Sequence, residues 1–335
     1  MENYLITWFY AEDKDDESYY PSVGGRTSTP EFQKVYWKCV FDFYRSAQLT
    51  QNPDSVRYLF FTNVPNIPTD VDGIPLADFF RETKIEVRRL DLTYRTPKDW
   101  YGAWRNQFYL FDILRCLSEN YAGNFLILDS DVFITQDLLP VFQEIQKKRV
   151  LCYECGDDAS GPINGISISQ MKSLYTDFSS GMDPEGIRYR CGEIIAITSD
   201  VIPDMLRCFY DLWKYNYTLY EKKENKLNEE AHFLSLIYHH LGYDNIYANP
   251  YIKRMWTALR HDNIAKGDEN LTIWHLPAEK KYLFDYMAGF LNQPVTREAY
   301  IRELRAKSHI PGWKATRYTK RFIARVWEKM NKKEL

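Results

Sequence analysis

A run of four apolar residues, 125–128 in the segment NFLILDSD (124–131), places the strongest constraint on the fold. A strand with one face in water alternates apolar and polar residues, whereas a short continuous apolar run is typical of a strand covered on both faces. Helices must then cover both sides of the sheet. A chain of 335 residues, 45% of them hydrophobic, can supply them. The sequence therefore predicts an α/β fold.

Strand-like and helix-like patterns alternate along the chain on both sides of this run. Upstream, strands and helices are expected in turn at 4–10, 31–49, 56–63, 76–82, 85–92 and 103–120. Downstream, we expect strands at 149–154, 191–199, 246–252 and 270–277, and helices at 138–146, at 201–217 and after Asn228. The stretch 155–190 is rich in Gly, Ser and Asp and reads as a long functional loop. These patterns indicate one domain at 1–280 and a helical extension at 281–335.

Charge and composition exclude several classes of partner. The net charge of −3 gives no field that would gather nucleic acid. No run approaches the ~20 apolar residues that a membrane-spanning helix needs, and the first residues lack a signal-peptide pattern, so we expect a cytoplasmic protein. The six cysteines are scattered, and we expect free thiols. Cys152 and Cys155 form a CxxC, but no second ligand pair at a zinc-site spacing accompanies them.

The C-terminal residues differ from the rest in charge. Residues 300–335 carry eleven basic and three acidic side chains, and apolar residues recur among the cations at helical spacing. Two interpretations remain open for this basic helix. It docks on the body of the protein with solvated lysines, or residues 314–333 make a peripheral contact with an anionic membrane at the inner face.

Two acids, Asp129 and Asp131, follow the buried run with one residue between them. Ligands of open α/β sheets bind at the carboxyl ends of the strands, and residues i and i+2 of an extended segment point to the same side. Two carboxylates aimed at one point repel each other unless a cation lies there. Mg²⁺ and Mn²⁺ bind such carboxylates together with water and phosphate oxygens. The alternative is a turn in which both acids make local hydrogen bonds.

This motif and its surroundings resemble the nucleotide-sugar-dependent glycosyltransferases of the GT-A fold, a Rossmann-like mixed sheet flanked by helices. In that family a D-x-D at this strand end holds a divalent metal and the donor diphosphate. The resemblance covers roughly residues 1–280. It is nearest to retaining types such as the histo-blood-group and glycogenin-like enzymes. It implies metal-dependent transfer of a sugar, most simply from a UDP-sugar, with Mn²⁺ or Mg²⁺ as cofactor.

Two stretches of the resemblance concern the donor. In YGAWRNQFYLFDIL, Arg105 matches a basic donor-contacting residue near a helix start. CGEIIAITSDVI is similar to a strand that borders the donor and acceptor sugars. There Gly192 would permit close approach and Glu193 would bond hydroxyls, although Cys191 replaces one member of a common Gly-Gly pair. Tyr10, at the end of the first strand, is available to stack on a base or sugar.

Two further stretches concern catalysis and the metal. LNEEAHFLSLIYHHLG resembles an acidic segment of the blood-group enzymes, which makes Glu229 and Glu230 the catalytic candidates. The resemblance implies that Glu230 lies beneath the anomeric carbon. LTIWHLPAEKKYL is similar to a glycogenin-like segment in which His275 would complete the metal site. Lys280 or Lys281 would then meet the diphosphate, although the glycine that usually follows the histidine is absent.

Each assignment has a structural alternative. Asn228 followed by two acids is also an ordinary capped helix start. His275 also fits a half-buried strand histidine, and Arg105 a solvated helix cation. For the whole chain the alternatives are a sugar nucleotidyltransferase and an inactive sugar-binding protein of the same fold. The acceptor stays open between a glycan such as a surface polysaccharide, a lipid-linked glycan and a protein.

Overall fold

The computed structural model describes residues 1–18, 20, 23–155, 161–179, 182–244, 247–258, 261–312 and 319. It contains a mixed sheet of six strands in the order β3-β2-β1-β4-β7-β6. These strands are β1 (Glu2–Phe9), β2 (Arg57–Thr62), β3 (Glu86–Arg89), β4 (Gly123–Leu128), β6 (Val150–Leu151) and β7 (Ile194–Thr198). Strands β1 to β4 run parallel, whereas β7 is antiparallel to both β4 and β6. The predicted α/β class is confirmed.

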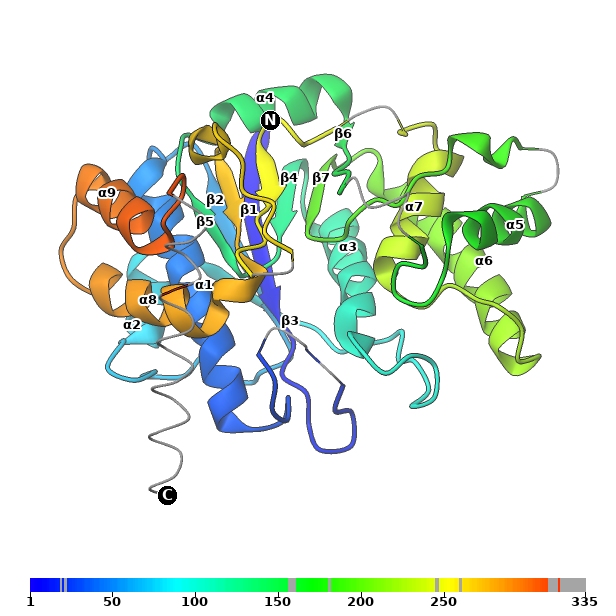
Figure 1. Ribbon diagram of the computed structural model, residues 1–335, viewed down its shortest axis with the longest axis horizontal. Helices are drawn as coiled ribbons and strands as arrows, with labels where there is room; N and C mark the ends of the chain where they lie inside the picture. Colours follow the sequence, from blue (N-terminus) through cyan, green and yellow to red (C-terminus); the bar gives the residue numbers. More distant parts are fainter. Residues whose placement is uncertain are drawn as a thin grey trace.

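Helices cover both faces of this sheet, as the apolar run predicted. On one face lie α1 (Pro30–Thr50), α2 (Leu76–Glu82), α4 (Leu139–Lys148), α8 (Asp285–Leu291) and α9 (Arg297–Ser308). On the other lie α3 (Tyr109–Asn120), α5 (Ile168–Phe178), α6 (Ile202–Glu221) and α7 (Glu230–His240). Figure 1 shows α1, α2, α8 and α9 on one side of β1 and β4, and α3, α5, α6 and α7 on the other. Alternate residues of β4 enter the two cores: Leu126 and Leu128 one, Phe125 and Ile127 the other.

A second sheet, of three strands, begins directly after the D-x-D motif. It consists of β5 (Val132–Ile134), β9 (Ile273–His275) and β8 (Ile252–Arg254), in the order β5-β9-β8. Antiparallel pairing aligns Val132 with His275. Because Val132 directly follows Asp131, this register brings residues that are far apart in the sequence to the carboxyl end of β4.

The prediction of one long loop at 155–190 is wrong in the middle of that stretch. Residues 155–190 include helix α5, which begins with a capping box: Ser167 accepts from the Gln170 backbone N–H, and the Gln170 side chain accepts from Ser167. Two other predictions need correction. The strand expected at 246–252 lies later, as β8, and the helix expected at 103–120 starts with a 3-10 turn, η1 (Arg105–Phe108).

The first part of the predicted C-terminal extension lies against the main core. Met287 and Leu291 of α8 and Tyr300 and Leu304 of α9 are buried in the same apolar cluster as α1. Most of the basic helix, 314–333, lies outside the described residues. None of the helices in the described ranges has the length and apolar composition that crossing a membrane requires.

Two cysteines are not the free thiols that the sequence predicted. Cys155 and Cys191 form a disulfide, with their Cα atoms 6.3 Å apart. Cys39, Cys116, Cys152 and Cys208 remain as buried thiols. Cys155 lies in the segment after β6 and Cys191 directly precedes Gly192, so the disulfide ties together the segments on either side of α5.

Alkylation counts test this disulfide. Iodoacetamide in denaturant without reductant is expected to modify four of the six cysteines, and all six after reduction. In the sample without reductant, mass spectrometry of the peptides should find Cys155 and Cys191 unmodified by iodoacetamide. Six modified cysteines without reductant would contradict the assignment.

Asp42 of α1 is buried in an apolar region, and neither carboxylate oxygen has a hydrogen-bond partner. Burial, with a contribution from the charge of Asp285, raises its pKa well above the ordinary range. The folded protein therefore keeps a proton that the unfolded chain has lost above about pH 4. It follows that this carboxyl group lowers stability progressively as the pH rises from about 4 to 7.

Asp42→Asn should therefore raise the free energy of unfolding at pH 7 by about 1–4 kcal/mol, and the gain should vanish near pH 4. Urea unfolding of both proteins at pH 4 and pH 7 measures the difference. The exposed Asp54→Asn is the control and should change stability little at either pH. A loss of stability in Asp42→Asn at pH 7 would contradict this account.

Candidate metal and donor site

A cavity of about 990 Å³ opens at the carboxyl ends of β1 and β4. Its wall includes Asp129, Asp131, Glu230, His275 and Lys280, and several aromatic side chains complete it. This is the edge of the sheet at which α/β proteins bind their ligands. The cavity is large enough for a ligand of cofactor size.

Asp129, Asp131 and His275 can hold a metal ion, because one ligand atom of each lies within 4.8 Å of the other two. The Nε2 atom of His275 is 3.1 Å from Asp131 Oδ2 and 3.8 Å from Asp129 Oδ2. Backbone hydrogen bonds fix both acids: the Asp129 N–H donates to the Glu193 carbonyl, and the Leu276 N–H donates to the Asp131 carbonyl. Two carboxylates and one imidazole are a suitable donor set for a divalent cation.

The charges of these three residues depend on one another. Burial and the charge of Asp131 raise the pKa of Asp129 to about 6. Burial disfavours the ionised form of Asp131 too, but the nearby Lys280 ammonium and His275 outweigh it and hold its pKa below the ordinary range. Burial lowers the pKa of His275, whereas Asp131 and Glu193 raise it, with a net result of about 9. The pair of acids thus attracts positive charge strongly.

Lys280 already supplies one such charge. Its Nζ donates to Asp131 Oδ2 at 2.5 Å and lies 5.6 Å from the centroid of the Tyr36 ring. Lys280 is 8% exposed and Asp131 is 2% exposed, so the ion pair is almost fully buried. Lys280 therefore contacts the second acid of the D-x-D directly, in the place where the resemblance implied contact with the diphosphate.

Glu193 lies behind His275. Its Oε1 atom is 3.6 Å from His275 Nδ1 and 3.4 Å from Arg254 Nε, and the residue is 5% exposed. Burial opposes ionisation of Glu193, but Arg254 and His275 lower its pKa on balance. A carboxylate beside the far nitrogen of a metal-binding histidine orients the ring. Glu193 is thus suited to positioning His275, although it also reaches the cavity wall.

Glu230 lies directly against Gly192, a contact that the sequence did not predict. A Cβ atom on Gly192 would be only 2.4 Å from Glu230 Oε1. The side-chain amide of Gln107, turned so that its nitrogen faces Glu230, donates to the two carboxylate oxygens at 2.9 and 2.5 Å. Burial and the charge of Glu229 raise the pKa of Glu230 well above its ordinary value. A buried carboxyl group with a raised pKa in a cavity is a candidate for catalysis.

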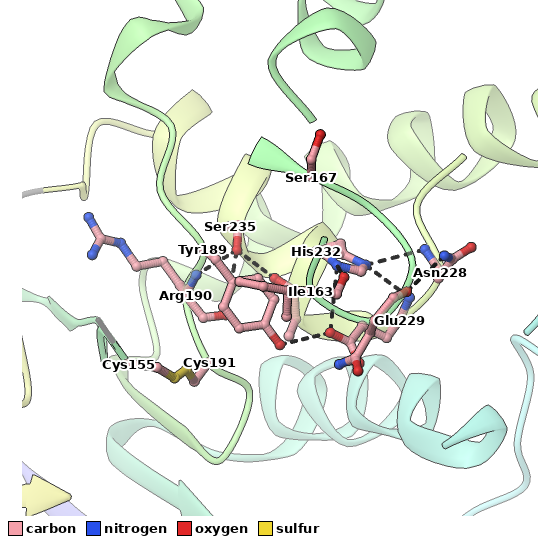
Figure 2. Close-up of polar contacts among 12 residues, drawn as sticks. Cys155, Ile163, Ser167, Tyr189, Arg190, Cys191, Asn228, Glu229, His232 and Ser235 are labelled. Atoms are coloured by element: carbon pink, nitrogen blue, oxygen red, sulfur yellow. Dashed lines mark hydrogen bonds and ion pairs between the residues drawn. A yellow bond between two sulfur atoms is a disulfide. The ribbon is translucent and has the colours of Figure 1, made fainter. Parts of the chain in front are cut away.

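Glu229 has a different environment, shown in Figure 2. It is the N-cap of α7 and forms a capping box with His232. Its carboxylate also accepts from Asn164 Nδ2 at 2.6 Å and from Tyr189 Oη at 2.7 Å. His232 in turn contacts the Ile163 carbonyl at 3.1 Å through Nε2. Glu229 therefore ties the 161–167 loop to the start of α7, and these partners occupy most of its acceptor sites.

The remaining predicted donor residues are divided between the cavity and its surroundings. Tyr10 and Lys281 line the cavity, and Tyr10 Oη accepts from Arg95 at 3.1 Å. Arg105 is not among the described residues that line the cavity. Its Nη2 instead donates to the Thr96 carbonyl at 2.7 Å, beside a much smaller hollow. Arg105 thus fixes the loop before α3.

Sequence reasoning missed three neighbours of the site. Gln107 lies two residues after Arg105, in a segment that was correctly linked to the donor, but nothing in the sequence marks it as the partner of Glu230. Asn164 stands in a Gly-rich stretch, where polar residues are common. Trp104 lines the cavity with a left-handed backbone, φ 50°, which is unusual for a bulky residue and cannot be read from composition.

No model of a known protein family matches the chain, and no curated protein has a matching sequence. A proposal on function therefore depends on the geometry of this site and on the chemistry that the site allows.

Proposed function

We propose that the protein is a metal-dependent glycosyltransferase of the GT-A type. In this proposal it transfers a sugar from a nucleotide-diphosphate sugar, most simply a UDP-sugar, to a hydroxyl group of a glycan, a lipid-linked glycan or a protein. The observation that carries the proposal is the meeting of Asp129, Asp131 and His275 at the carboxyl end of β4, in a cavity that also contains Glu230.

The donor set favours Mn²⁺ or Mg²⁺. Carboxylates suit both ions, and the single imidazole favours Mn²⁺ of the two. When bound, such an ion neutralises the charge that develops on the departing diphosphate. Asp129 and Asp131 would hold it from the end of β4, and His275 from β9, with the Glu193 carboxylate 3.6 Å from the other ring nitrogen of His275.

Glu230 is the proposed catalytic residue. As the bond between sugar and diphosphate breaks, the sugar acquires positive charge at its anomeric carbon. A carboxylate held by Gln107 next to Gly192 at the cavity wall can stabilise that charge or attack the carbon. Burial, and after it the charge of Glu229, raise the pKa of Glu230, and the approach of a cationic sugar would favour its ionised form. The proposal includes a retaining outcome because the sequence resembles retaining types.

A screen of nucleotide sugars tests the proposal. The protein is incubated with Mn²⁺ and a panel of UDP-, GDP-, TDP- and CMP-sugars, and mass spectrometry detects hydrolysis or transfer. Release of a nucleoside diphosphate from at least one donor, dependent on Mn²⁺, is the expected result. Release of pyrophosphate from a nucleoside triphosphate and a sugar phosphate would instead identify a nucleotidyltransferase. The absence of any metal-dependent thermal shift with nucleoside diphosphates would remove the basis of the proposal.

A further inference from the structure

We infer that Lys280 is a built-in competitor of the divalent cation. It neutralises Asp131 in the metal-free site, so that a metal binds strongly only together with an anionic ligand that takes up the displaced ammonium group. The inference rests on the proposed function, since it concerns the same site, and it describes how binding of metal and donor would be coupled.

The competition follows from the geometry around one oxygen atom. Asp131 Oδ2 accepts from Lys280 Nζ at 2.5 Å and lies 3.1 Å from His275 Nε2. A cation that bridges Asp131 and His275 would meet the ammonium within a few ångströms. Two positive charges at that distance repel strongly in a buried site, where the effective dielectric constant is low. Lys280 must therefore leave Asp131 when the metal enters.

Lys280 has a path away from Asp131. Its flexible four-carbon stem lets the ammonium move without a change in the backbone. The nitrogen faces the Tyr36 ring, and both residues line the cavity, so the displaced group stays at the cavity wall. A diphosphate carried in by the cation would present oxygens there, and an ammonium group is a good donor to phosphate.

A purely structural ion pair would behave differently. If Lys280 only held Asp131 in position, its removal would disorganise the site and weaken metal binding. If Lys280 competes with the metal, its removal leaves Asp129, the buried Asp131 and His275 with too little positive charge, and metal binding becomes tighter. The two roles therefore predict opposite changes in metal affinity.

Binding of Mn²⁺ alone is the first measurement. Electron paramagnetic resonance of free Mn²⁺ gives the affinity of the unmodified protein, Lys280→Met and Lys280→Gln. Both variants should bind Mn²⁺ at least about tenfold more tightly, within the usual range of coupling between sites. Gln keeps a hydrogen-bond donor for Asp131, so it serves if the Met variant does not fold. Equal or weaker Mn²⁺ binding by a folded variant would overturn the inference.

Lys253→Met is the matched control. Lys253 is also partly buried and paired with an acid, Asp268, at 2.8 Å, but the ion pair lies outside the cavity wall formed by the described residues. Its loss should leave the Mn²⁺ affinity unchanged. A gain equal to that of the Lys280 variants would show a general effect of net charge and would overturn the inference.

Binding of pyrophosphate at saturating Mn²⁺ is the second measurement. Calorimetry should show about tenfold weaker binding to Lys280→Gln, because the displaced ammonium is no longer there to receive the anion. Unchanged pyrophosphate binding would overturn this half of the inference. If the unmodified protein bound neither Mn²⁺ nor pyrophosphate together with Mn²⁺, the proposed function itself would fail. In that case, tight Mn²⁺ binding by Lys280→Gln would still support the competition between Lys280 and the metal. Failure of the proposed function and failure of the inference therefore give different results.

Discussion

Asp129→Asn should strongly lower metal-dependent turnover of a nucleotide sugar while leaving the protein at least as stable as before. Asp129 is the more accessible of the two acids, with 32% of its side chain exposed, and it contacts His275 only at 3.8 Å. Burial and the charge of Asp131 raise its pKa to about 6, so ionisation of Asp129 near neutral pH lowers the stability of the metal-free fold, and a neutral Asn is tolerated at least as well. We expect turnover to fall by at least about a hundredfold, since even indirect neighbours of a metal commonly contribute 10- to 100-fold.

Asp131→Asn is the informative partner of this variant. It should also remove turnover, but it leaves Lys280 and His275 buried without the carboxylate that neutralises them. Breaking one side of a buried ion pair commonly costs about 3–5 kcal/mol. Thermal melts and Mn²⁺ binding of both variants, with Asp54→Asn as surface control, separate the two roles. Equal losses of stability in Asp129→Asn and Asp131→Asn would contradict the difference that we derive from their contacts.

The local patterns of the sequence predicted most of the main sheet and its helices. Apolar spacing identifies α1 because its buried face repeats along one continuous segment, and Thr29 accepts from the Phe32 N–H to start the helix, with Pro30 at its first position. The D-x-D motif was also visible, because two acids after a buried strand are costly without a partner. These features depend on neighbours in the sequence.

Features that depend on distant pairing were not predictable in the same way. The small sheet exists because β5 and β9 pair across more than a hundred residues, and no local pattern fixes that register. The Cys155–Cys191 disulfide likewise depends on a distance in space. Helix α5 was missed for another reason: its Gly- and Ser-rich surroundings suggested a loop, although Ser167 and Gln170 have the spacing of a capping box.

The two adjacent acids at the start of α7 illustrate how position decides chemistry. The sequence offered both Glu229 and Glu230 as catalytic candidates, and the resemblance placed Glu230 beneath the anomeric carbon. The structure gives Glu229 three hydrogen-bonding neighbours and a capping role, whereas Glu230 faces the cavity with Gln107 as its partner. Glu229 has the extended backbone of an N-cap, whereas Glu230 is the first helical residue, so the two side chains have different surroundings. The adjacent acids can therefore serve different functions.

Glu230→Gln should accordingly lower turnover by at least about a hundredfold while leaving the affinities for Mn²⁺ and nucleoside diphosphate within about threefold of the original. The substitution keeps the size of the side chain and removes only its ability to carry negative charge near the sugar. Steady-state turnover and calorimetric binding, measured on the same preparation, test both halves. Weakened diphosphate binding with normal turnover would contradict a catalytic role.

Glu229→Ala gives the contrasting result that a structural role requires. It removes the N-cap of α7 and leaves Asn164 and Tyr189 without their acceptor, so we expect a loss of about 1–3 kcal/mol in the free energy of unfolding. Turnover per folded molecule should fall less than in Glu230→Gln. If Glu229→Ala lost as much turnover as Glu230→Gln without losing stability, the assignment of the catalytic role to Glu230 alone would be contradicted.

Gly192→Ala tests the catalytic role of Glu230 by moving its carboxylate instead of removing its charge. The added methyl group would lie 2.4 Å from Glu230 Oε1, so Glu230 must turn away from its present position. Because catalysis depends on placement to within a fraction of an ångström, turnover should fall by about a hundredfold even though every polar group is still present. Mn²⁺ binding should not change, since Asp129, Asp131 and His275 are untouched. The loss of turnover with intact metal binding would then connect the geometry at Gly192 to the chemistry at Glu230.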